Sequence, residues 1–282
     1  MVLRVGETEF KLLRDLIEER SGILLGDDKT YLIENRLSHI VEEAGCANFK
    51  NFYRKIKNLP PSEQLWNEVI EAITTHETLW FRDEYPFKVV QEYILPKYKE
   101  ETETGKRSAI NIWSAACSTG QEPYSIAMTL LDYYRVSGGE DICRNQVKIF
   151  ATDISSAVIA TAGKGQYDKI AIRRGLPDQK CEQYFRYENG FWYIDQKIID
   201  MVTFKQFNLY RPLTALERFD IIFLRNVIIY FSDHFKKELF EKIAEVLSPG
   251  GFMFLGTGET TGGYTTAFEI VEHAGSIFYR VK

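Results

Sequence analysis

The sequence predicts an α/β fold in which a mostly parallel sheet, closed by an antiparallel hairpin, follows an all-helical N-terminal domain. Three observations lead to this prediction. Apolar residues recur at helical spacing through residues 8–73, where no strand signal occurs. From residue 109 onward, short apolar runs alternate with helical stretches, which is typical of a parallel sheet with crossover helices. Residues 164–200 break this alternation and predict an inserted small antiparallel β-subdomain.

Size, charge and cysteine content narrow the class of protein. The chain has 282 residues, 45% hydrophobic and 14% aromatic, which suits a packed globular core. Its net charge of -5 disfavours a nucleic-acid binder, which usually carries a basic surface. The N-terminus has no apolar signal core, and Arg225 and Asn226 interrupt the most apolar window, so we expect no membrane insertion. The scattered cysteines, without a C-x-x-C pair, predict reduced thiols and a cytoplasmic protein.

Four helices account for the N-terminal domain, which we place at residues 1–73. Thr8 suits the N-cap of the first helix and Gly22 its end, Gly45 ends the second helix, and Ser62 suits the N-cap of the fourth. Residues 74–108 then form a linker that includes a connecting helix. The apolar stripes of these helices lie at 10–17, 32–44, 49–56, 65–73 and, for the connecting helix, 84–98.

The third part, residues 109–282, carries the sheet. Pro123 suits the start of the helix after the first strand, and Pro249-Gly250-Gly251 stops a helix over 233–247. Asn189-Gly190 signals a hairpin turn inside the insertion. We expect strands at 110–113, 147–151, 202–207, 219–224 and 251–255, a helix at 155–162, and a closing hairpin of 268–271 and 277–281.

The turn of small residues from Ser114 to Gly120 is the first candidate for a ligand site. It joins a strand to a helix, where an α/β sheet lets a nucleotide-like ligand approach the backbone, although ordinary turns have a similar composition. Asp153 ends the next strand, where a carboxylate commonly accepts hydrogen bonds from ribose hydroxyls. Its alternative role is to cap the helix that begins near Ser155. No P-loop pattern occurs.

Polar residues at two other positions point to the same edge of the sheet. Glu122 opens a helix, where the macrodipole favours a carboxylate, and a cationic ligand would give it a second role. Arg225 and Asn226 follow an apolar strand at its carboxyl end, where ligands bind in open α/β sheets. A structural ion pair is the alternative for Arg225, and a core position is the alternative for Tyr230.

The segment 74–82 lies at the boundary between the helical part and the sheet part, a preferred place for a cleft. His76 lies in this segment. The other histidines, His39, His234 and His273, show no partner spacing, and no cysteines are paired. We therefore expect no metal site.

Taken in order, these motifs resemble those of the CheR-type chemoreceptor glutamate O-methyltransferases, which use S-adenosylmethionine. The resemblance covers nearly the whole chain. Trp-Ser-Ala-Ala-Cys-Ser-Thr-Gly-Gln-Glu-Pro-Tyr-Ser at 113–125 is similar to that family's cofactor loop. The further matches are Thr-x-x-x-Phe-Arg-Asp at 78–83, Ala-Thr-Asp-Ile at 151–154, Asn-Leu at 208–209 and Arg-Asn-Val-Ile-Ile-Tyr-Phe at 225–231.

The resemblance implies a class I (Rossmann-like) methyltransferase sheet and the transfer of methyl groups to glutamates in the cytoplasmic helices of chemoreceptors, with S-adenosylhomocysteine as product. It places Arg82 and Tyr230 close to the methyl-transfer centre, and Asp153 on the ribose. It also implies that the β-subdomain docks a receptor C-terminal peptide. The positions it assigns to the cofactor site are His76, Thr78, Arg82, Glu122, Asp153, Asn208, Leu209, Arg225 and Asn226.

The sequence departs from the family pattern in three places. His76 stands where the family often has Asn, and Gly256-Thr257-Gly258-Glu259 replaces a more usual Gly-His-Ser-Glu. The second helix carries Glu42 and Glu43 where many members are basic. The third helix offers either an alternative basic surface or an ordinary solvated face, through Lys50, Arg54, Lys55 and Lys57.

The chemistry that the resemblance implies needs few catalytic groups. A glutamate side chain has an ordinary pKa near ~4.3, so it is already an anion at neutral pH and needs no general base. The absence of a Ser/His/Asp or Cys/His constellation from the sequence is consistent with this. Two alternatives stay open: a class I methyltransferase acting on another protein or a small molecule, and a non-catalytic S-adenosylmethionine-binding adaptor.

Overall fold

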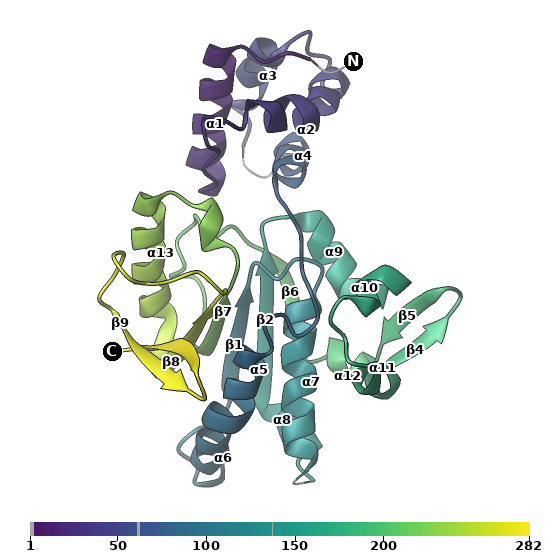
Figure 1. The fold of residues 1–282 in the computed structure, drawn as a ribbon, viewed down its shortest axis with the longest axis vertical. Helices are drawn as coiled ribbons and strands as arrows, with labels where there is room; N and C mark the ends of the chain where they lie inside the picture. Colours follow the sequence, from purple (N-terminus) through teal and green to yellow (C-terminus); the bar gives the residue numbers. More distant parts are fainter. Residues whose placement is uncertain (1–2, 61–62, 137) are drawn as a thin grey trace.

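The computed structural model describes residues 3–60, 63–136 and 138–282. A helical N-terminal domain lies at one end of the molecule, beyond the ends of the central strands (Figure 1). The expected N-cap Ser62 lies outside the described residues. The helices of this domain are α1 (Glu7–Ser21), α2 (Thr30–Glu43), α3 (Phe49–Ile56) and α4 (Gln64–Ile73).

The central sheet has seven strands in the order β6-β2-β1-β7-β8-β10-β9. The first five of these pair in parallel, whereas β10 runs antiparallel to both β8 and β9. The predicted parallel sheet with a closing hairpin is therefore confirmed. The strands are β1 (Ile110–Ala115), β2 (Val147–Asp153), β6 (Val202–Gln206), β7 (Phe219–Leu224), β8 (Leu247–Leu255), β9 (Phe268–His273) and β10 (Ser276–Val281).

Helices pack on both faces of the sheet. Successive side chains of β7 enter two different buried clusters, because neighbouring residues of a strand point to opposite faces. The first cluster joins α13 and the helical domain, and the second joins the connecting helices and α7. The helices are α5 (Tyr85–Val89), a π-helical turn (Val90–Ile94), α6 (Leu95–Glu103), α7 (Gln121–Arg135), α8 (Glu140–Gln146), α9 (Ser156–Lys164) and α13 (Asp233–Val246).

The insertion between α9 and β6 carries a small antiparallel sheet of order β3-β5-β4, as expected (Figure 1). Asn189 and Gly190 both have positive φ, 51° and 87°, which is the geometry that a tight hairpin turn requires. The elements of the insertion are β3 (Gln166–Tyr167), α10 (Lys169–Arg173), α11 (Asp178–Tyr184), β4 (Phe185–Glu188), β5 (Phe191–Ile194) and α12 (Gln196–Ile199).

Several predicted element ends are wrong by a few residues. Helix α1 begins at Glu7 with Gly6 as N-cap, not Thr8, and α7 begins at Gln121, before Pro123. Helix α13 ends at Val246, and Pro249-Gly250-Gly251 lies inside β8. The pairing of β7 with β8 shifts register between Phe219 and Ile221, so this irregularity accommodates the proline and glycines.

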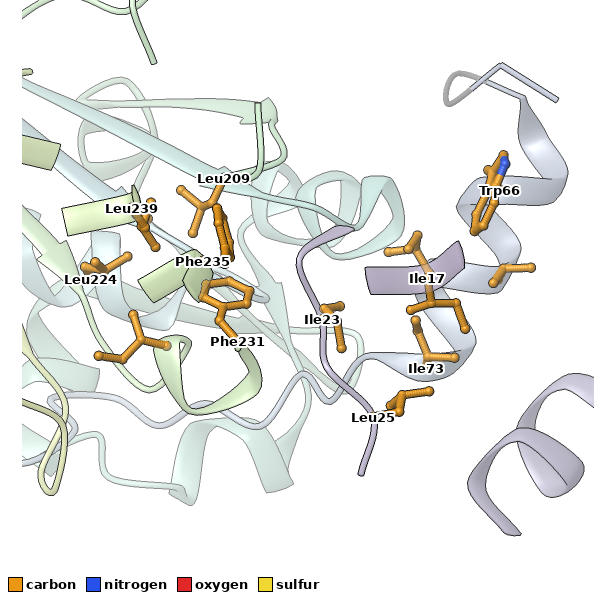
Figure 2. Close-up of a cluster of buried hydrophobic side chains, with 14 of the residues drawn as sticks. Ile17, Ile23, Leu25, Trp66, Ile73, Leu209, Leu224, Phe231, Phe235 and Leu239 are labelled. Carbon is orange, nitrogen blue, oxygen red and sulfur yellow. The ribbon is translucent and has the colours of Figure 1, made fainter. Parts of the chain in front are cut away.

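The helical domain and the sheet share one hydrophobic cluster. Ile23, which follows α1, approaches Phe231, and Phe231 packs against Phe235, whereas Leu25 lies beside Ile73 (Figure 2). Ile23 forms an isolated antiparallel bridge with Phe231, and the Leu24 N–H donates to the Tyr230 carbonyl at 2.8 Å. This contact fixes the helical domain above the carboxyl ends of the strands. No helix in the described ranges is long and apolar enough to span a bilayer.

Candidate functional site

A pocket lies between the helical domain and the carboxyl ends of β1, β2 and β7. It is lined by segments from both parts of the protein, including the linker that follows α4. The structure brings all ten candidate side chains of the sequence analysis to this one pocket. They are His76, Thr78, Arg82, Glu122, Asp153, Asn208, Leu209, Arg225, Asn226 and Tyr230.

The turn between β1 and α7 forms one wall of the pocket with an unusual backbone. Ala116, Ser118 and Gly120 have φ of 68°, 49° and 94°. A Cβ at Gly120 would lie 3.0 Å from the Ala162 Cβ, so glycine permits close packing of this turn against α9. The wall next to a ligand is therefore formed largely by backbone and short side chains.

Asp153 lies at the end of β2 and is 6% exposed. Its carboxylate accepts backbone N–H bonds from Ser118 at 2.9 Å and from Ser155 at 3.0 Å. Burial raises the pKa of Asp153, and these two bonds oppose that rise. The N-cap of α9 is Ser155, whose Oγ accepts the Val158 N–H, so Asp153 is not the capping residue.

Glu122 and Arg225 form a buried ion pair, in which Arg225 Nη1 lies 2.9 Å from Glu122 Oε2. Arg225 also pairs with Asp83 at 2.7 Å, and its side chain is 1% exposed. The Ser114 hydroxyl donates to Glu122 at 2.7 Å. Burial raises the pKa of Glu122, although Arg225 acts in the opposite direction. The structural ion pair that was the alternative role of Arg225 is thus present, and it fixes Glu122 at the pocket wall.

Arg82 and Tyr230 are held less tightly than the buried pair. In the part of the chain that the structure describes, the Arg82 guanidinium donates one long hydrogen bond, 3.4 Å, to the Glu77 carbonyl. Tyr230 is 39% exposed, and within the described residues its hydroxyl has no hydrogen-bond partner. Both side chains line the pocket and remain free to contact a ligand. The alternative interpretation of Tyr230 as a core residue is therefore wrong, because its side chain is partly exposed.

Asn208 and Asn226 are fixed by contacts that the sequence did not indicate. The Asn208 amide donates to the Arg20 carbonyl of the helical domain at 2.8 Å. Asn226 has φ of 56°, and Glu259 accepts its N–H at 2.7 Å. Glu259 also accepts the N–H groups of Gly256 and Ile228, so this residue, which sequence reasoning left without interpretation, shapes the turn after β7.

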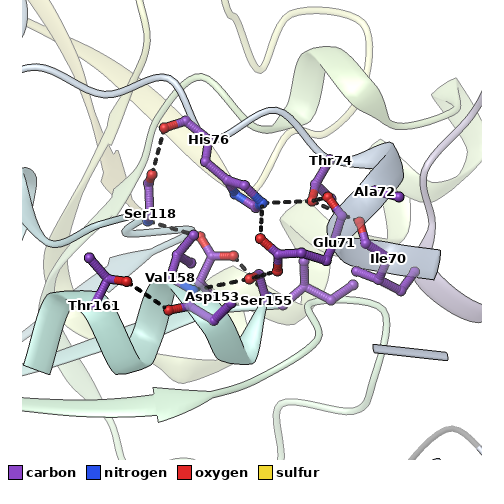
Figure 3. Close-up of polar contacts among 12 residues, drawn as sticks. Ile70, Glu71, Ala72, Thr74, His76, Ser118, Asp153, Ser155, Val158 and Thr161 are labelled. Atoms are coloured by element: carbon purple, nitrogen blue, oxygen red, sulfur yellow. Dashed lines mark hydrogen bonds and ion pairs between the residues drawn. The ribbon is translucent and has the colours of Figure 1, made fainter. Parts of the chain in front are cut away.

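Glu71 is a second residue that sequence reasoning missed. It lies on α4, and its carboxylate contacts His76 Nε2 at 3.2 Å and the Ser155 hydroxyl (Figure 3). His76 Nε2 also lies 2.9 Å from Thr74 Oγ1. No pattern in the sequence joins Glu71 to Ser155, because 84 residues separate them.

Among the residues that the structure describes, no group of three or more His, Cys, Asp or Glu side chains could hold a metal ion. All four cysteines are free thiols. Burial raises the pKa of Cys117, which lies in the β1–α7 turn, so its thiol is not activated as a nucleophile.

Comparison with protein families matches both parts of the chain. The all-alpha domain of CheR methyltransferases matches residues 8–74, and their S-adenosylmethionine-binding domain matches residues 76–277. The chain belongs to the CheR methyltransferase family. The parallel sheet with its antiparallel β10, the helical domain and the inserted sheet are accordingly a class I methyltransferase fold with the two additions that the sequence predicted.

Curated relatives extend this similarity over the full chain. Chemotaxis protein methyltransferase Cher2 of Pseudomonas putida is 37% identical over 99% of this chain and 100% of its own length. The chemotaxis protein methyltransferase of Vibrio parahaemolyticus is 37% identical over 99% of both chains. That of Escherichia coli is 30% identical over 91% of this chain and 86% of its own.

Solved structures of other methyltransferases are more distant. Magnesium protoporphyrin IX methyltransferase of Synechocystis, with bound S-adenosylmethionine, covers 86% of this chain and 94% of its own, with 10% identity and a TM-score of 0.36.

The match to the S-adenosylmethionine-binding domain of CheR methyltransferases identifies S-adenosylmethionine as the cofactor, and the pocket fits it chemically. Asp153 offers a carboxylate to sugar hydroxyls, and the β1–α7 turn offers backbone at close range.

Proposed function

We propose that the protein methylates glutamate side chains of chemoreceptor proteins to give glutamate methyl esters. Methylation dependent on S-adenosylmethionine, in chemotaxis, is the activity that the family and its full-length relatives carry. The observation that supports a carboxylate substrate is the loosely held Arg82 guanidinium in the pocket, because an arginine fork can bond both carboxylate oxygens.

Each pocket residue has a role in this proposal. Asp153 accepts hydrogen bonds from the ribose hydroxyls. The rest of the cofactor site is formed by His76, Thr78, Glu122, Asn208, Leu209, Arg225 and Asn226. Arg225 acts by holding Glu122 in place. Arg82 and Tyr230 orient the incoming glutamate or the methionine end of the cofactor.

The bound cofactor supplies an electrophilic methyl group on a sulfonium centre. Because the substrate carboxylate is already ionised at neutral pH, the protein has no proton to remove. Its residues hold the carboxylate oxygen in line with the methyl group, and positioning of this kind supplies on the order of 7–11 kcal/mol. The helical domain contributes Ser21, Ile23 and Ile73 to the lining of this pocket, next to Phe231.

The test is incubation with labelled methyl donor and cytoplasmic fragments of candidate receptors, followed by alkaline release of methanol. Glutamate esters release volatile label in base, and fragments with Ala at the acceptor glutamates remain unlabelled. Base-stable label would indicate another methyl acceptor, and label in a small molecule would favour the alternative substrate class. Binding of S-adenosylhomocysteine without turnover on any fragment would favour the adaptor alternative.

A substrate of this kind places the protein in the cytoplasm, beside the receptor helices. Helix α2 presents exposed Glu42 and Glu43, of which Glu43 pairs with His39 at 3.1 Å. The cations that would face an acidic receptor lie on and just after α3. They are Lys50, Arg54, Lys55 and Lys57, all exposed.

The inserted sheet offers a second contact with the receptor. Strand β4 pairs with β5 on one side only, and its Tyr187 is 63% exposed. A receptor C-terminal peptide would add a strand at this edge. Titration with candidate tail peptides tests this, and no binding up to millimolar concentration would leave the insertion a structural element.

A further inference from the structure

We propose that Glu71 and His76 are positioning residues that couple the helical domain to cofactor binding. Through them, the placement of α4 sets the orientation of Asp153, and a bound cofactor in turn holds α4 in place. This inference rests on the proposed role of Asp153 in binding the ribose.

The contacts around Asp153 form a closed ring (Figure 3). Glu71 accepts a hydrogen bond from the Ser155 hydroxyl, and the Ser155 N–H donates to Asp153 Oδ1. Asp153 Oδ2 accepts the Ser118 N–H, and the Ser118 hydroxyl donates to the His76 carbonyl at 2.8 Å. His76 Nε2 closes the ring on Glu71 at 3.2 Å. The ring therefore joins α4, the linker, the β1–α7 turn and the β2–α9 turn.

The two residues that donate hydrogen bonds to Asp153, Ser118 and Ser155, are themselves bonded to other segments of the protein. The carboxylate is oriented by the N–H groups of Ser118 and Ser155. The hydroxyl of Ser118 is tied to the linker, and the hydroxyl of Ser155 is tied to α4. A shift of α4 would move Ser155 and would change the direction in which Asp153 faces the pocket.

Burial makes this coupling stronger than it would be on the surface. Asp153 is 6% exposed and Ser155 is 2% exposed, so a broken bond cannot readily be replaced by water. Glu71 is the outer member, with a side chain 38% exposed, and it can be replaced without opening the core. Thermodynamic coupling is reciprocal, so cofactor binding must stabilise α4 as much as α4 favours cofactor binding.

The experiment compares Glu71→Ala with Glu68→Ala in the full chain. Glu68 lies on the same helix, and its carboxylate accepts a hydrogen bond from the Gln64 amide at 3.0 Å, outside the ring. Calorimetric titration with S-adenosylhomocysteine should show affinity lowered at least about 5-fold in Glu71→Ala, the lower end of typical coupling between sites, and unchanged in Glu68→Ala. The conservative Glu71→Gln, which keeps an acceptor for Ser155, should recover part of the loss.

Amide hydrogen exchange distinguishes coupling from a purely structural role of Glu71, because a purely structural contact would not make exchange in α4 depend on the ligand. In the unsubstituted protein, S-adenosylhomocysteine should slow exchange over residues 64–73, and this protection should be reduced in Glu71→Ala. Equal affinity in both variants, or α4 exchange that is indifferent to the ligand in the unsubstituted protein, would overturn the inference. The exchange measurement on the unsubstituted protein remains a test of the inference even if Glu71→Ala fails to fold. Failure of the unsubstituted protein to bind S-adenosylhomocysteine would instead overturn the proposed function.

Discussion

Two buried carboxylates, those of Asp153 and Glu122, line the pocket, and each is held by different partners. Asp153 relies on backbone N–H groups, whereas Glu122 relies on the Arg225 guanidinium and the Ser114 hydroxyl. Burial raises the pKa of both above that of an exposed carboxyl. Because each binds its proton more tightly in the folded than in the unfolded chain, its contribution to stability is present below the ordinary pKa and is lost as the pH rises through the raised one.

Cofactor affinity should depend on pH through Asp153. Only the ionised carboxylate accepts hydrogen bonds from both ribose hydroxyls. Affinity for S-adenosylhomocysteine should therefore fall as the pH is lowered from neutral towards the raised pKa of Asp153. Binding should then release protons, which calorimetry at acidic pH in two buffers of different ionisation enthalpy measures.

Two ionisable groups of the ring act on the pKa of Asp153 in opposite directions, since His76 lowers it and Glu71 raises it. Glu71→Gln and His76→Asn therefore serve as controls, and the pH dependence should persist in both. Affinity that stays constant from about pH 7.5 down to the ordinary aspartate pKa of about 3.9 would contradict the ribose role of Asp153.

The loosely held side chains should affect turnover more than cofactor affinity. Arg82→Ala should lower kcat by more than about 10-fold, because the fork that orients the carboxylate is lost, and Tyr230→Phe should lower it less. Steady-state methylation, with S-adenosylhomocysteine affinity measured separately, distinguishes the two effects. Lys88→Ala, an exposed cation on α5, is the control. Near-normal turnover in both variants would remove Arg82 and Tyr230 from the methyl-transfer centre.

At the scale of elements, the turns at the strand ends shape the pocket. The turn after β7 places Arg225 and Asn226 side by side and leads into the 3-10 turn Ile228–Tyr230. Glu259, which lies after β8, holds this turn by accepting the N–H groups of Asn226 and Ile228, and it also accepts the N–H of Gly256. A Cβ at Gly256 would lie 2.5 Å from Asn226 Nδ2, so any larger residue there would have to displace the Asn226 side chain.

Replacing Glu259 should therefore destabilise the protein through this turn. Glu259→Ala leaves three N–H groups without their acceptor and should lower the free energy of unfolding by at least about 2 kcal/mol. Urea unfolding measures the change, and the exposed Glu245→Ala on α13 is the matched control. Equal midpoints for the two variants would show that the turn is held by other contacts.

The sequence predicts elements better than it predicts the contacts between them. The strand at 219–224 and the closing hairpin follow from local apolar runs, and Gly22 ends α1 in the left-handed conformation, with φ of 75°. The helix start at Thr8 is wrong because a glycine two residues earlier has the extended backbone of an N-cap. The roles of Glu71 and Glu259 depend on partners that are distant in the sequence, so no local pattern could reveal them.

The same limit applies to the candidate site. All ten candidate side chains line one pocket, since strand ends of a parallel sheet meet at one edge and the family motifs mark them. The sequence could not show that Asp83 would share Arg225 with Glu122, or that the Asn208 amide would reach the Arg20 carbonyl. Those contacts depend on how the linker and the helical domain pack against the sheet.

For the whole molecule, the shared cluster makes the helical domain part of the same core as the sheet. Ile23 bridges to Phe231 directly, and both are at least nine-tenths buried (Figure 2). The polar ring around Asp153 is a second, separate connection between the two parts (Figure 3). The pocket lies between these connections, so its shape depends on both.

The two parts should therefore unfold together. Phe231→Ala removes a buried ring at the contact between the helical domain and the sheet. The change should lower the free energy of unfolding by about 3–5 kcal/mol. Scanning calorimetry should show a single transition whose calorimetric and van't Hoff enthalpies agree, shifted to lower temperature as a whole in the variant. Ile270→Ala on β9, where the side chain is 67% exposed, should leave the transition nearly unchanged. Two separate transitions, with Phe231→Ala moving only one, would show that the helical domain folds independently of the sheet and that the pocket closes by docking of two preformed parts.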